Sequence, residues 1–485
     1  MIVGSFIFFL ALFLGIGLYA HLHSRHSHRD YLLANQETPP WLAGLSAGAT
    51  ANSGYMFTGL IGYAYLVGLP SIWLGLGMII GDIVASSFIH RRLRSVTNMG
   101  QAETYAGILS HWNGTDFRMY RHLAGFVSLI FLSTYAAAQF VAGSKALHVL
   151  FGWEEFVGAL IGAAIVASYS WAGGIRASIW TDALQAIVMM VAMIVLLVLA
   201  LDFVGGISAA WTALDAVSPT HLDLVPPDLQ FGALGPLLFG LGWIVAGFCV
   251  VGQPHIMVRF MTLDRPENTN RARVYYYAWT FLFGLVATAM GLLTRILLPP
   301  DVVFDAELAL PTVALDLLPG ILVGVVIAGM FAATLSTADS LILSCAANLT
   351  DDFAPEDRLP LVIVRGGTLL MTLVALAIAL SGDQSVFTLV ILAWSMMGAV
   401  FAPLITVYAL GGRPNQPLAI AMLVSAVACV VLWQMTPELA LYYKGFLGFI
   451  VGFVVYLIGS RLGLVLGKSH TARDSFLHHA ETESH

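Results

Sequence analysis

The sequence predicts an all-α polytopic membrane protein, and its composition and its run of apolar stretches both point to this class. Of the 485 residues, 59% are hydrophobic and only 10% are charged, and the mean hydropathy is +0.85. A soluble domain is about 45–50% apolar and about 25% charged, so this chain has too few charges to cover a water-facing surface. A soluble enzyme and a disordered chain are excluded. Nucleic acid is excluded as a partner, because Lys and Arg number only 21 and the formal net charge is −7.

Thirteen apolar stretches predict about thirteen transmembrane helices, since one spanning helix uses about 20 residues. The expected spans are 2–20, 41–66, 68–90, 123–150, 156–172, 180–203, 232–258, 274–298, 313–347, 360–381, 384–410, 416–436 and 444–467. No basic residue precedes the first span and no small-residue cleavage site follows it, so we expect an uncleaved helix rather than a signal peptide. The gap at 204–231 is expected to be an external loop with a short surface helix.

The positions of Lys and Arg predict an external N-terminus and a cytoplasmic C-terminus. With the N-terminus outside, 18 of the 21 basic residues fall in cytoplasmic segments, and only Lys145, Arg295 and Lys444 fall outside. Cytoplasmic segments of membrane proteins carry an excess of Lys and Arg. The imbalance favours an odd number of spans, and it places the polar, His-rich tail, 468–485, in the cytoplasm.

Small polar residues interrupt the second span between Leu45 and Tyr55, where Gly48 and Gly54 stand among Ser, Thr and Asn. Unwound backbone at membrane depth is tolerated where it lines a cavity, and its free carbonyl groups can then bind a cation. The alternative is close helix packing through small residues. The residues of this span leave both interpretations open.

The ninth span carries a set of oxygen atoms that suits Na⁺. Ala333, Ser336, Thr337 and Ser340 share one helical face by the i, i+3, i+4 rule, although Ser and Thr also bond to their own helix. Asp339 stands beside them, and an unpaired carboxylate in a membrane is costly. The pattern predicts an ion site.

Further polar and aromatic residues are weaker candidates. Asp182, at the cytoplasmic start of the sixth span, either caps that helix or binds an ion, and Asp82 in the third span has no partner that the sequence identifies. Tyr135 and Gln139 lie one helical turn apart in the fourth span, and Trp243 lies in the seventh. They suggest a pocket for an organic solute, although single aromatic residues usually serve packing.

Together these segments resemble the sodium:solute symporter family, and most closely its sodium/proline symporter branch. Four segments carry the resemblance: Leu45-Ser46-Ala47-Gly48-Ala49 with Ser53-Gly54; Gly173-Gly174-Ile175-Arg176-Ala177 leading to Trp180-Thr181-Asp182; Gly252-Gln253-Pro254-His255-Ile256 with Arg259-Phe260-Met261; and Ala333 through Ser340. A looser fifth segment holds Ala393-Trp394, Gly398 and Phe401-Ala402-Pro403. They follow one another in the family's order over about residues 30–410.

The resemblance implies the inverted-repeat fold of the amino-acid transporter LeuT. The broken helices would be 41–66 and 232–258, the second of them broken at Gln253-Pro254. The implied division is 1–40 for an extra helix and the first cytoplasmic loop, 41–203 for the first five-helix repeat, 204–231 for the external loop, 232–412 for the inverted second repeat, 413–467 for two C-terminal helices, and 468–485 for the tail.

The resemblance also implies where ions would bind. The family's main sodium site would use backbone carbonyls of Ala49, Asn52 and Ala333 with the hydroxyl groups of Ser336 and Thr337. A second site, for Na⁺ or a proton, would use Asp182, Asp339 and Ser340 with Ser336. The family often has a hydroxyl where Asp339 stands, so this site would carry an additional carboxylate.

A solute pocket is implied at the membrane midplane. Its candidate residues are Ser53, Gly54, Tyr135, Gln139, Trp243, Ala246 and Val250. Proline symporters carry an acidic residue where this chain has Ala51, and aromatic residues where it has Ala246 and Val250, so proline is one candidate among small amino acids, carboxylates and zwitterions.

The expected function is sodium-coupled symport of such a solute by alternating access in the inner membrane of a bacterium. Na⁺ is the expected coupling ion and the only expected metal, with no other cofactor. The spans hold no pattern of catalytic or metal-ligating residues that predicts an enzyme. The alternatives are a proton-coupled carrier of the same fold, favoured by Asp182 or Asp339, and a solute sensor that would need a separate output partner.

Overall fold

The computed structural model describes residues 1–25, 27–98, 102–298, 305–353, 359–382 and 385–466, and the expected tail at 468–485 lies outside this part. The described chain is helical, with two isolated β-bridges and no strand. Ten segments are long and apolar enough to cross a membrane, and two shorter apolar segments, Gly54–Val67 and Gly445–Arg461, add to them. The protein is therefore a multi-pass membrane protein, whereas the count of thirteen spans and the orientation stay predictions.

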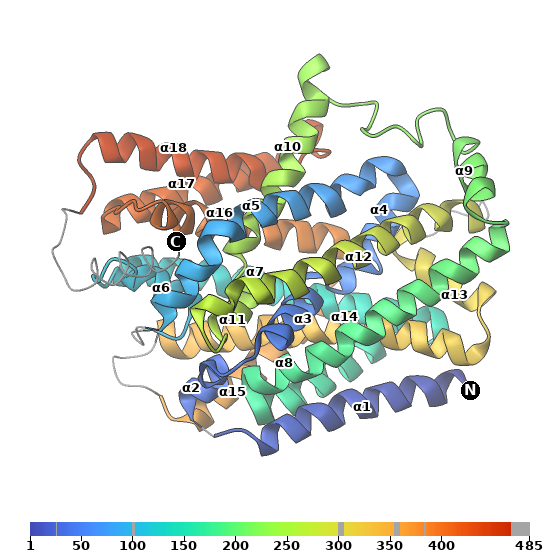
Figure 1. Cartoon of the computed structure of the whole chain (residues 1–485), viewed down its shortest axis with the longest axis horizontal. Coiled ribbons are helices and arrows are strands. Elements are labelled where there is room, and N and C mark those ends of the chain that lie inside the picture. The colour runs from blue at the N-terminus through green and yellow to red at the C-terminus, as the bar shows by residue number, and fades with distance from the viewer. Residues whose placement is uncertain (26, 99–101, 299–304, 354–358, 383–384, 467–485) are drawn as a thin grey trace.

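The helices follow one another along the chain, and a long connection joins α9 to α10, as Figure 1 shows. Their bounds are α1 Ile2–Leu22, α2 His28–Leu33, α3 Pro40–Ala51, α4 Gly59–Val67, α5 Ile72–Thr97, α6 Tyr105–His111, α7 Arg118–Phe151, α8 Glu155–Val204, α9 Ile207–Asp215, α10 Gly235–Phe248, α11 Pro254–Met261, α12 Thr269–Leu297, α13 Ala309–Leu317, α14 Gly320–Ala347, α15 Leu361–Ala379, α16 Val386–Ala409, α17 Gln416–Gln434 and α18 Gly445–Arg461. The short helix α9 lies in the expected external loop.

Three expected spans, the fifth, the sixth and the ninth, differ from the observed helices in their boundaries. The fifth and sixth spans are continuous in α8, which turns back on itself at Gly174 (φ 56°, ψ −147°). Tyr169 and Thr181, on either side of this turn, both lie against Gly17 of α1. The ninth span was expected from residue 313, but Pro319 separates α13 from α14, because proline cannot continue a hydrogen-bonded helix.

The second and seventh spans are broken, as expected. The second consists of α3 and α4, separated by the short segment Gly54–Met56, and the seventh consists of α10 and α11, separated by Cys249–Gly252. At Gly54 the chain passes so close to α14 that an added Cβ would lie 2.5 Å from Cγ2 of Thr334. At the other break, Gln253 is extended and donates to the carbonyl oxygen of Trp394 (3.0 Å).

Helix α14 is the centre of the bundle. It packs against α1, α3, α7, α8 and α15, while α17 and α18 lie next to each other at an edge of the molecule (Figure 1). Most of the side chains of α14 are buried, including every one from Val326 to Leu343. A polar residue on α14 therefore faces protein and not lipid, which is the arrangement that a transport site requires.

Candidate ion and solute site

The break after α3 faces the hydroxyl-bearing face of α14. Ser336 Oγ lies 3.4 Å from the carbonyl oxygen of Ala49 and 3.1 Å from that of Ala333. Thr337 Oγ1 donates to the carbonyl oxygen of Thr50 (3.0 Å). All of these residues are buried. Four of the five residues expected at the main sodium site are thus brought together as a set of oxygen atoms, which are the ligands that hard cations prefer.

Asn52, the fifth, lies at the end of α3, where the helix stops. Its side chain points away from α14, since Nδ2 donates to the carbonyl oxygen of Gly48 (3.0 Å) and approaches Thr280 Oγ1 on α12 (3.4 Å). The side chain of Asn52 therefore holds the end of α3, and the contribution expected from its backbone carbonyl stays a prediction.

The residues expected at the second ion site surround a buried arginine. Arg259, from α11, forms an ion pair with Asp182 of α8 (Nη2 to Oδ2, 3.0 Å), and both side chains are completely buried. The same nitrogen donates to Ser178 Oγ (2.6 Å) and to Ser340 Oγ. Nε donates to Ser46 Oγ of α3 (3.2 Å). The guanidinium group thus links α3, α8 and α14 from α11, the second half of the second broken helix.

Asp339 adds a second carboxylate to this cluster. Its Oδ1 accepts from Ser178 Oγ (3.1 Å) and Ser340 Oγ (2.9 Å). Asp339 Oδ2 and Asp182 Oδ1 accept no hydrogen bond from the residues that the structure describes. With both carboxylates ionised and one guanidinium present, the cluster carries a net charge of −1. A buried group of this kind is stable only if a cation or a proton balances it.

Four residues of this cluster were not predicted from the sequence: Ser46, Thr50, Ser178 and Arg259. Two spacings could have indicated them, because Ser46 and Thr50, like Ser178 and Asp182, lie one helical turn apart and share a face. Arg259 was counted with the cytoplasmic charges, although two membrane carboxylates without a partner call for a positive charge close by.

The aromatic candidates line a pocket on the other side of the break after α3, and its empty space, including the part open to solvent, is about 750 Å³. Four of the expected solute residues face it, namely Tyr135, Trp243, Ala246 and Val250. Its other walls come from α3 to α5, α12 and α16, with α18 approached through Tyr443. The additional lining residues are Ala51, Asn52, Tyr55, Met56, Leu60, Leu74, Gly75, Met78, Ile79, Asp82, Tyr276, Thr280, Gly284, Val390, Ile391, Trp394 and Tyr443.

The other three expected solute residues, Ser53, Gly54 and Gln139, lie behind the residues that line this cavity. Gln139 Oε1 accepts from the backbone N–H of Gly54 (2.9 Å), and Tyr135 donates its hydroxyl hydrogen to Ser53 Oγ (3.3 Å). Ser53, Gly54 and Gln139 therefore fix the unwound segment, and they do not line the cavity.

The model of the sodium:solute symporter family matches residues 31–425. The chain belongs to the sodium:solute symporter family. Sodium/proline symporters of Staphylococcus aureus, from strains JH9 and NCTC 8325 among others, are 28% identical to it over 476 residues, which cover 94% of this chain and 91% of the relative. As a member of this family the protein is a membrane transporter and not an enzyme.

Solved structures confirm the fold class of this symporter family member. A Na⁺-coupled sialic acid symporter in a substrate-bound, outward-open state superposes with a TM-score of 0.79 at 19% identity, covering 95% of this chain and 98% of that one. A nucleobase-cation-symport-1 family transporter in a closed conformation gives 0.58 at 13% identity, covering 89% and 93%. The chain therefore has the LeuT-like, all-α fold expected from its sequence.

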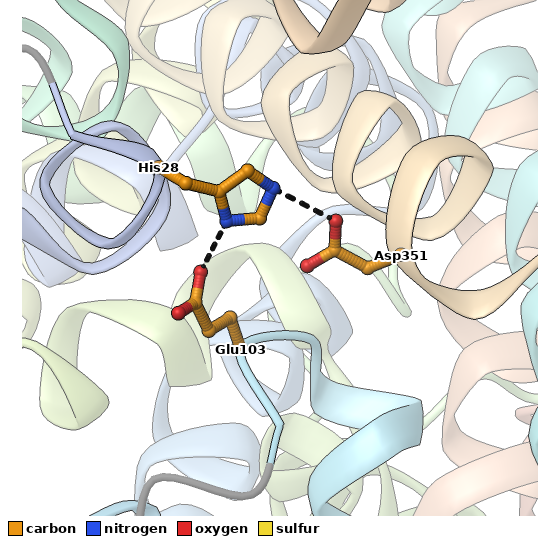
Figure 2. A group of neighbouring side chains, drawn as sticks. All are labelled: His28, Glu103 and Asp351. Carbon is orange, nitrogen blue, oxygen red and sulfur yellow. Dashed lines mark hydrogen bonds and ion pairs between the residues drawn. The ribbon is translucent and has the colours of Figure 1, made fainter. Parts of the chain in front are cut away.

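The two ends of the symporter are built differently. A second pocket, with about 650 Å³ of empty space including the part open to solvent, shares Trp243, Ile391 and Tyr443 with the first. It is also lined by Lys444, which the charge distribution places outside. At the other end, His28 of α2 lies between two carboxylates, as Figure 2 shows: Nδ1 is 2.6 Å from Glu103 Oε2, and Nε2 is 3.1 Å from Asp351 Oδ1. This cluster ties together the segments before α3, before α6 and after α14.

Charge–charge contacts strengthen the closure at that end. Hydrogen bonds to Asp351 and then to Glu103 raise the pKa of His28 from 6.5 to about 9, so the imidazole is positively charged at neutral pH. Arg176, just after the turn of α8, pairs with the buried Asp30 of α2 (2.6 Å). The helix α2 is thereby held against α8 and α14.

Proposed function

We propose that this protein is a secondary active transporter that couples Na⁺ entry to uptake of a small organic solute across the inner membrane of a bacterium. The observation that carries the proposal is the oxygen set between the break after α3 and the hydroxyl-bearing face of α14, next to a pocket lined by aromatic side chains. Membership in a sodium-coupled family supports the choice of ion.

Na⁺ would replace the contacts that Ser336 and Thr337 now make with α3. The hydroxyl groups lie 3.4 and 3.0 Å from the carbonyl oxygens of Ala49 and Thr50, and an ion between them would turn both sets of oxygens toward itself. Binding would pin the broken helix to α14, and α3 and the segment after it form one wall of the solute cavity. Ion and solute would in this way stabilise the same arrangement, which is what coupling requires.

The transport cycle would begin from the cavity that leads toward Lys444. Rocking of one repeat against the other would close that path and open the end held by His28 and Asp30. The electrical part of the driving force is about 2.3 kcal/mol per elementary charge per 100 mV, and the Na⁺ gradient adds to it. No covalent chemistry and no cofactor other than the coupling ion is needed.

A small amino acid such as proline, or a related carboxylate or zwitterion, is the proposed class of solute. The relatives that carry the name sodium/proline symporter favour it. Ala51, Ala246 and Val250 line the cavity with small or aliphatic side chains, so the proline-specific aromatic and acidic positions of that branch are changed.

Thermal unfolding of the purified protein in NaCl and in KCl tests the sodium site. A ligand that binds only the folded state stabilises it by RT ln(1+[L]/Kd), so Na⁺ should raise the melting temperature and K⁺ should not. Ser336→Ala and Thr337→Ala should each abolish the Na⁺ effect. Thr372→Ala, which removes a buried hydroxyl that bonds only within α15, is the matched control and should retain it.

A proton-coupled carrier is the second candidate, and the cluster around Arg259 favours it. The net charge of −1 in that cluster is balanced by one proton as well as by one Na⁺. If Na⁺ leaves the melting temperature unchanged at every pH while solute binding follows pH and is altered by Asp339→Asn, protons are the coupling ion and the sodium sites are wrong.

A further inference from the structure

We infer that the transported solute carries a positively charged nitrogen, and that Asp82 of α5 is the residue that selects it inside the aromatic cavity. The inference rests on the proposed function, because it takes this cavity to be the solute site. It narrows the candidate solutes to amines, quaternary ammonium compounds and zwitterions that contain nitrogen, and it excludes organic anions that lack nitrogen.

Asp82 is the only residue with a formal charge among the described residues that line the cavity. Its side chain is 2% exposed, and its Oδ1 accepts no hydrogen bond from the described residues. The hydroxyl groups of Tyr276 and Tyr277 lie beside the carboxylate, but that of Tyr277 is also engaged with Ser86 Oγ (2.6 Å). An acceptor is thus left free at the cavity.

The nearby positive charge does not form an ion pair with Asp82. Arg273 of α12 contributes to the electrostatic environment of Asp82, but its Nε donates to Ser86 Oγ (3.0 Å) and its Nη2 to the carbonyl oxygen of Ile83 (3.2 Å). No ion pair within 4.0 Å joins Asp82 to a described residue. A carboxylate without an ion-pair partner within a membrane costs several kcal/mol. A positively charged ligand that pairs with Asp82 therefore gains binding free energy.

The remaining walls favour a cation as well. The cavity is lined by the rings of Tyr55, Tyr135, Trp243, Trp394 and Tyr443, and the faces of aromatic rings attract ammonium groups. No Lys or Arg is among the lining residues that the structure describes. The carboxylate of a nitrogen-free anion would therefore be repelled by Asp82, and no basic side chain of the lining would offset the repulsion.

Free hydrogen-bond donors are available for the other end of the solute. Trp394 uses its Nε1–H on the carbonyl oxygen of Ala246 (3.1 Å). In contrast, Trp243 Nε1 and the hydroxyl group of Tyr55 have no partner among the described residues. An oxygen atom on the solute, such as a hydroxyl or the carboxylate of a zwitterion, can accept from them while the nitrogen faces Asp82.

Thermal stabilisation in NaCl with two sets of probes tests the inference. The nitrogen-bearing set is choline, ethanolamine, L-proline, L-alanine and glycine betaine, and the nitrogen-free set is acetate, L-lactate and succinate. We expect stabilisation by at least one member of the first set and by none of the second. A response limited to choline and ethanolamine would indicate a cationic solute, and a response to the amino acids or the betaine would indicate a zwitterion.

Asp82→Asn is the decisive variant, because it removes the charge and keeps the shape. It should weaken binding of the responding probe on the order of tenfold or more, which is about 1.4 kcal/mol, and it should retain the stabilisation by Na⁺ alone. That retained response shows that the variant is folded and separates this inference from the sodium site tested by Ser336→Ala. Asp82→Glu should bind the probe better than Asp82→Asn does, and Asp316→Asn, at an exposed carboxylate of α13, is the matched control.

Three outcomes would overturn the inference. The first is stabilisation by acetate, lactate or succinate that Asp82→Asn leaves unchanged or improves. The second is loss of the Na⁺ response in Asp82→Asn with the protein still folded by circular dichroism, which would move Asp82 into the ion-binding machinery. The third is a wild-type protein that responds to Na⁺ but to no nitrogen-bearing probe.

Discussion

Arg259 is the buried cation around which the carboxylates of Asp182 and Asp339 are arranged. Burying three ionisable groups carries a large desolvation cost, and mutual attraction offsets it only when geometry and hydrogen bonding are good. Here the guanidinium group contacts Ser46, Ser178, Asp182 and Ser340 at once. Removing one charged partner should therefore lower the free energy of unfolding by much more than the ion pair contributes to it, because the remaining charges stay buried without compensation.

Arg259→Met should lower the free energy of unfolding by about 3–5 kcal/mol, the range for breaking a buried ion pair. Thermal unfolding in detergent measures the change. The double variant Arg259→Met with Asp182→Asn should recover part of the loss, since it removes one of the uncompensated carboxylates. Arg265→Met, at an exposed arginine, is the control and should change little. Equal melting temperatures for Arg259→Met and Arg265→Met would show that the ion pair is not structural.

At the scale of the helices, Gly54 and the Gln253-Pro254 pair lie where the structure breaks the two helices. The residues of the second span left close packing open as well, and the family resemblance decided for a break, whereas Gly48 lies within the continuous helix α3. The meeting of Arg259 with Asp182 was not predictable in this way, because it joins segments 77 residues apart. Residue type and spacing describe one helix at a time, while a contact between helices depends on their packing.

The helices α5 and α10 approach each other through glycine. A Cβ at Gly81 would lie 1.7 Å from the carbonyl oxygen of Ile244, and one at Gly247 would lie 1.8 Å from that of Met78. Backbone that is this close cannot accommodate a methyl group without a shift of a whole helix, and overpacking typically costs about 1–3 kcal/mol.

Gly81→Ala should therefore destabilise the protein and reduce solute binding, since α5 and α10 carry Asp82 and Trp243. Melting temperature and the solute-induced shift measure the two effects. Gly366→Ala on α15, where an added Cβ meets nothing within 4 Å, should be neutral or slightly stabilising because Ala favours helix. Equal melting temperatures for Gly81→Ala and Gly366→Ala would show that the close approach of α5 and α10 is absent in solution.

The cluster of His28 with Glu103 and Asp351 makes closure of its end of the bundle depend on pH. Because the pKa of His28 is raised to about 9 in the folded protein, its contribution to stability is fully present below the unfolded value near 6.5 and is lost as pH rises through about 9. The gap in melting temperature between the wild type and His28→Gln should shrink from pH 6.5 to pH 10.

His148→Gln, at an exposed histidine near the end of α7, is the control for this pH dependence. Its melting temperature should follow that of the wild type at every pH. A gap between the wild type and His28→Gln that is constant over the whole range would mean that the imidazole of His28 is not charged by its two carboxylates.

For the molecule as a whole, the uneven distribution of Lys and Arg makes a topological prediction. Glu438 and Arg461 are exposed, and the first stands before α18 while the second is its last residue, so they should lie on opposite sides of the membrane. In a cysteine-free background, Glu438→Cys should react with a membrane-impermeant maleimide in intact cells. Arg461→Cys should react only after permeabilisation. Labelling of Arg461→Cys in intact cells would reverse the predicted orientation.

The sequence supported the whole-molecule architecture more fully than the site. Apolar runs and family motifs predicted the membrane class and the LeuT-like fold, because both are encoded along the chain. The sites depend on which faces of distant helices meet. Ser336 and Ala49 were predicted through resemblance, whereas the presence of Asp82 in the lining of the same cavity as Ala51 and Asn52 became visible only in the packed bundle.

Thr50 belongs to both candidate cation sites. Its carbonyl oxygen accepts from Thr337, and its hydroxyl group lies 3.4 Å from Asp182 Oδ2 and 3.3 Å from Ser340 Oγ. A cation that pulls the carbonyl group of Thr50 toward itself would shift the backbone to which the hydroxyl group is attached, and the two proposed cation sites would then be coupled. By thermodynamic linkage, each cation would alter the affinity for the other by the same factor, so the proposal of two sites includes a measurable cooperativity between them that Thr50 transmits.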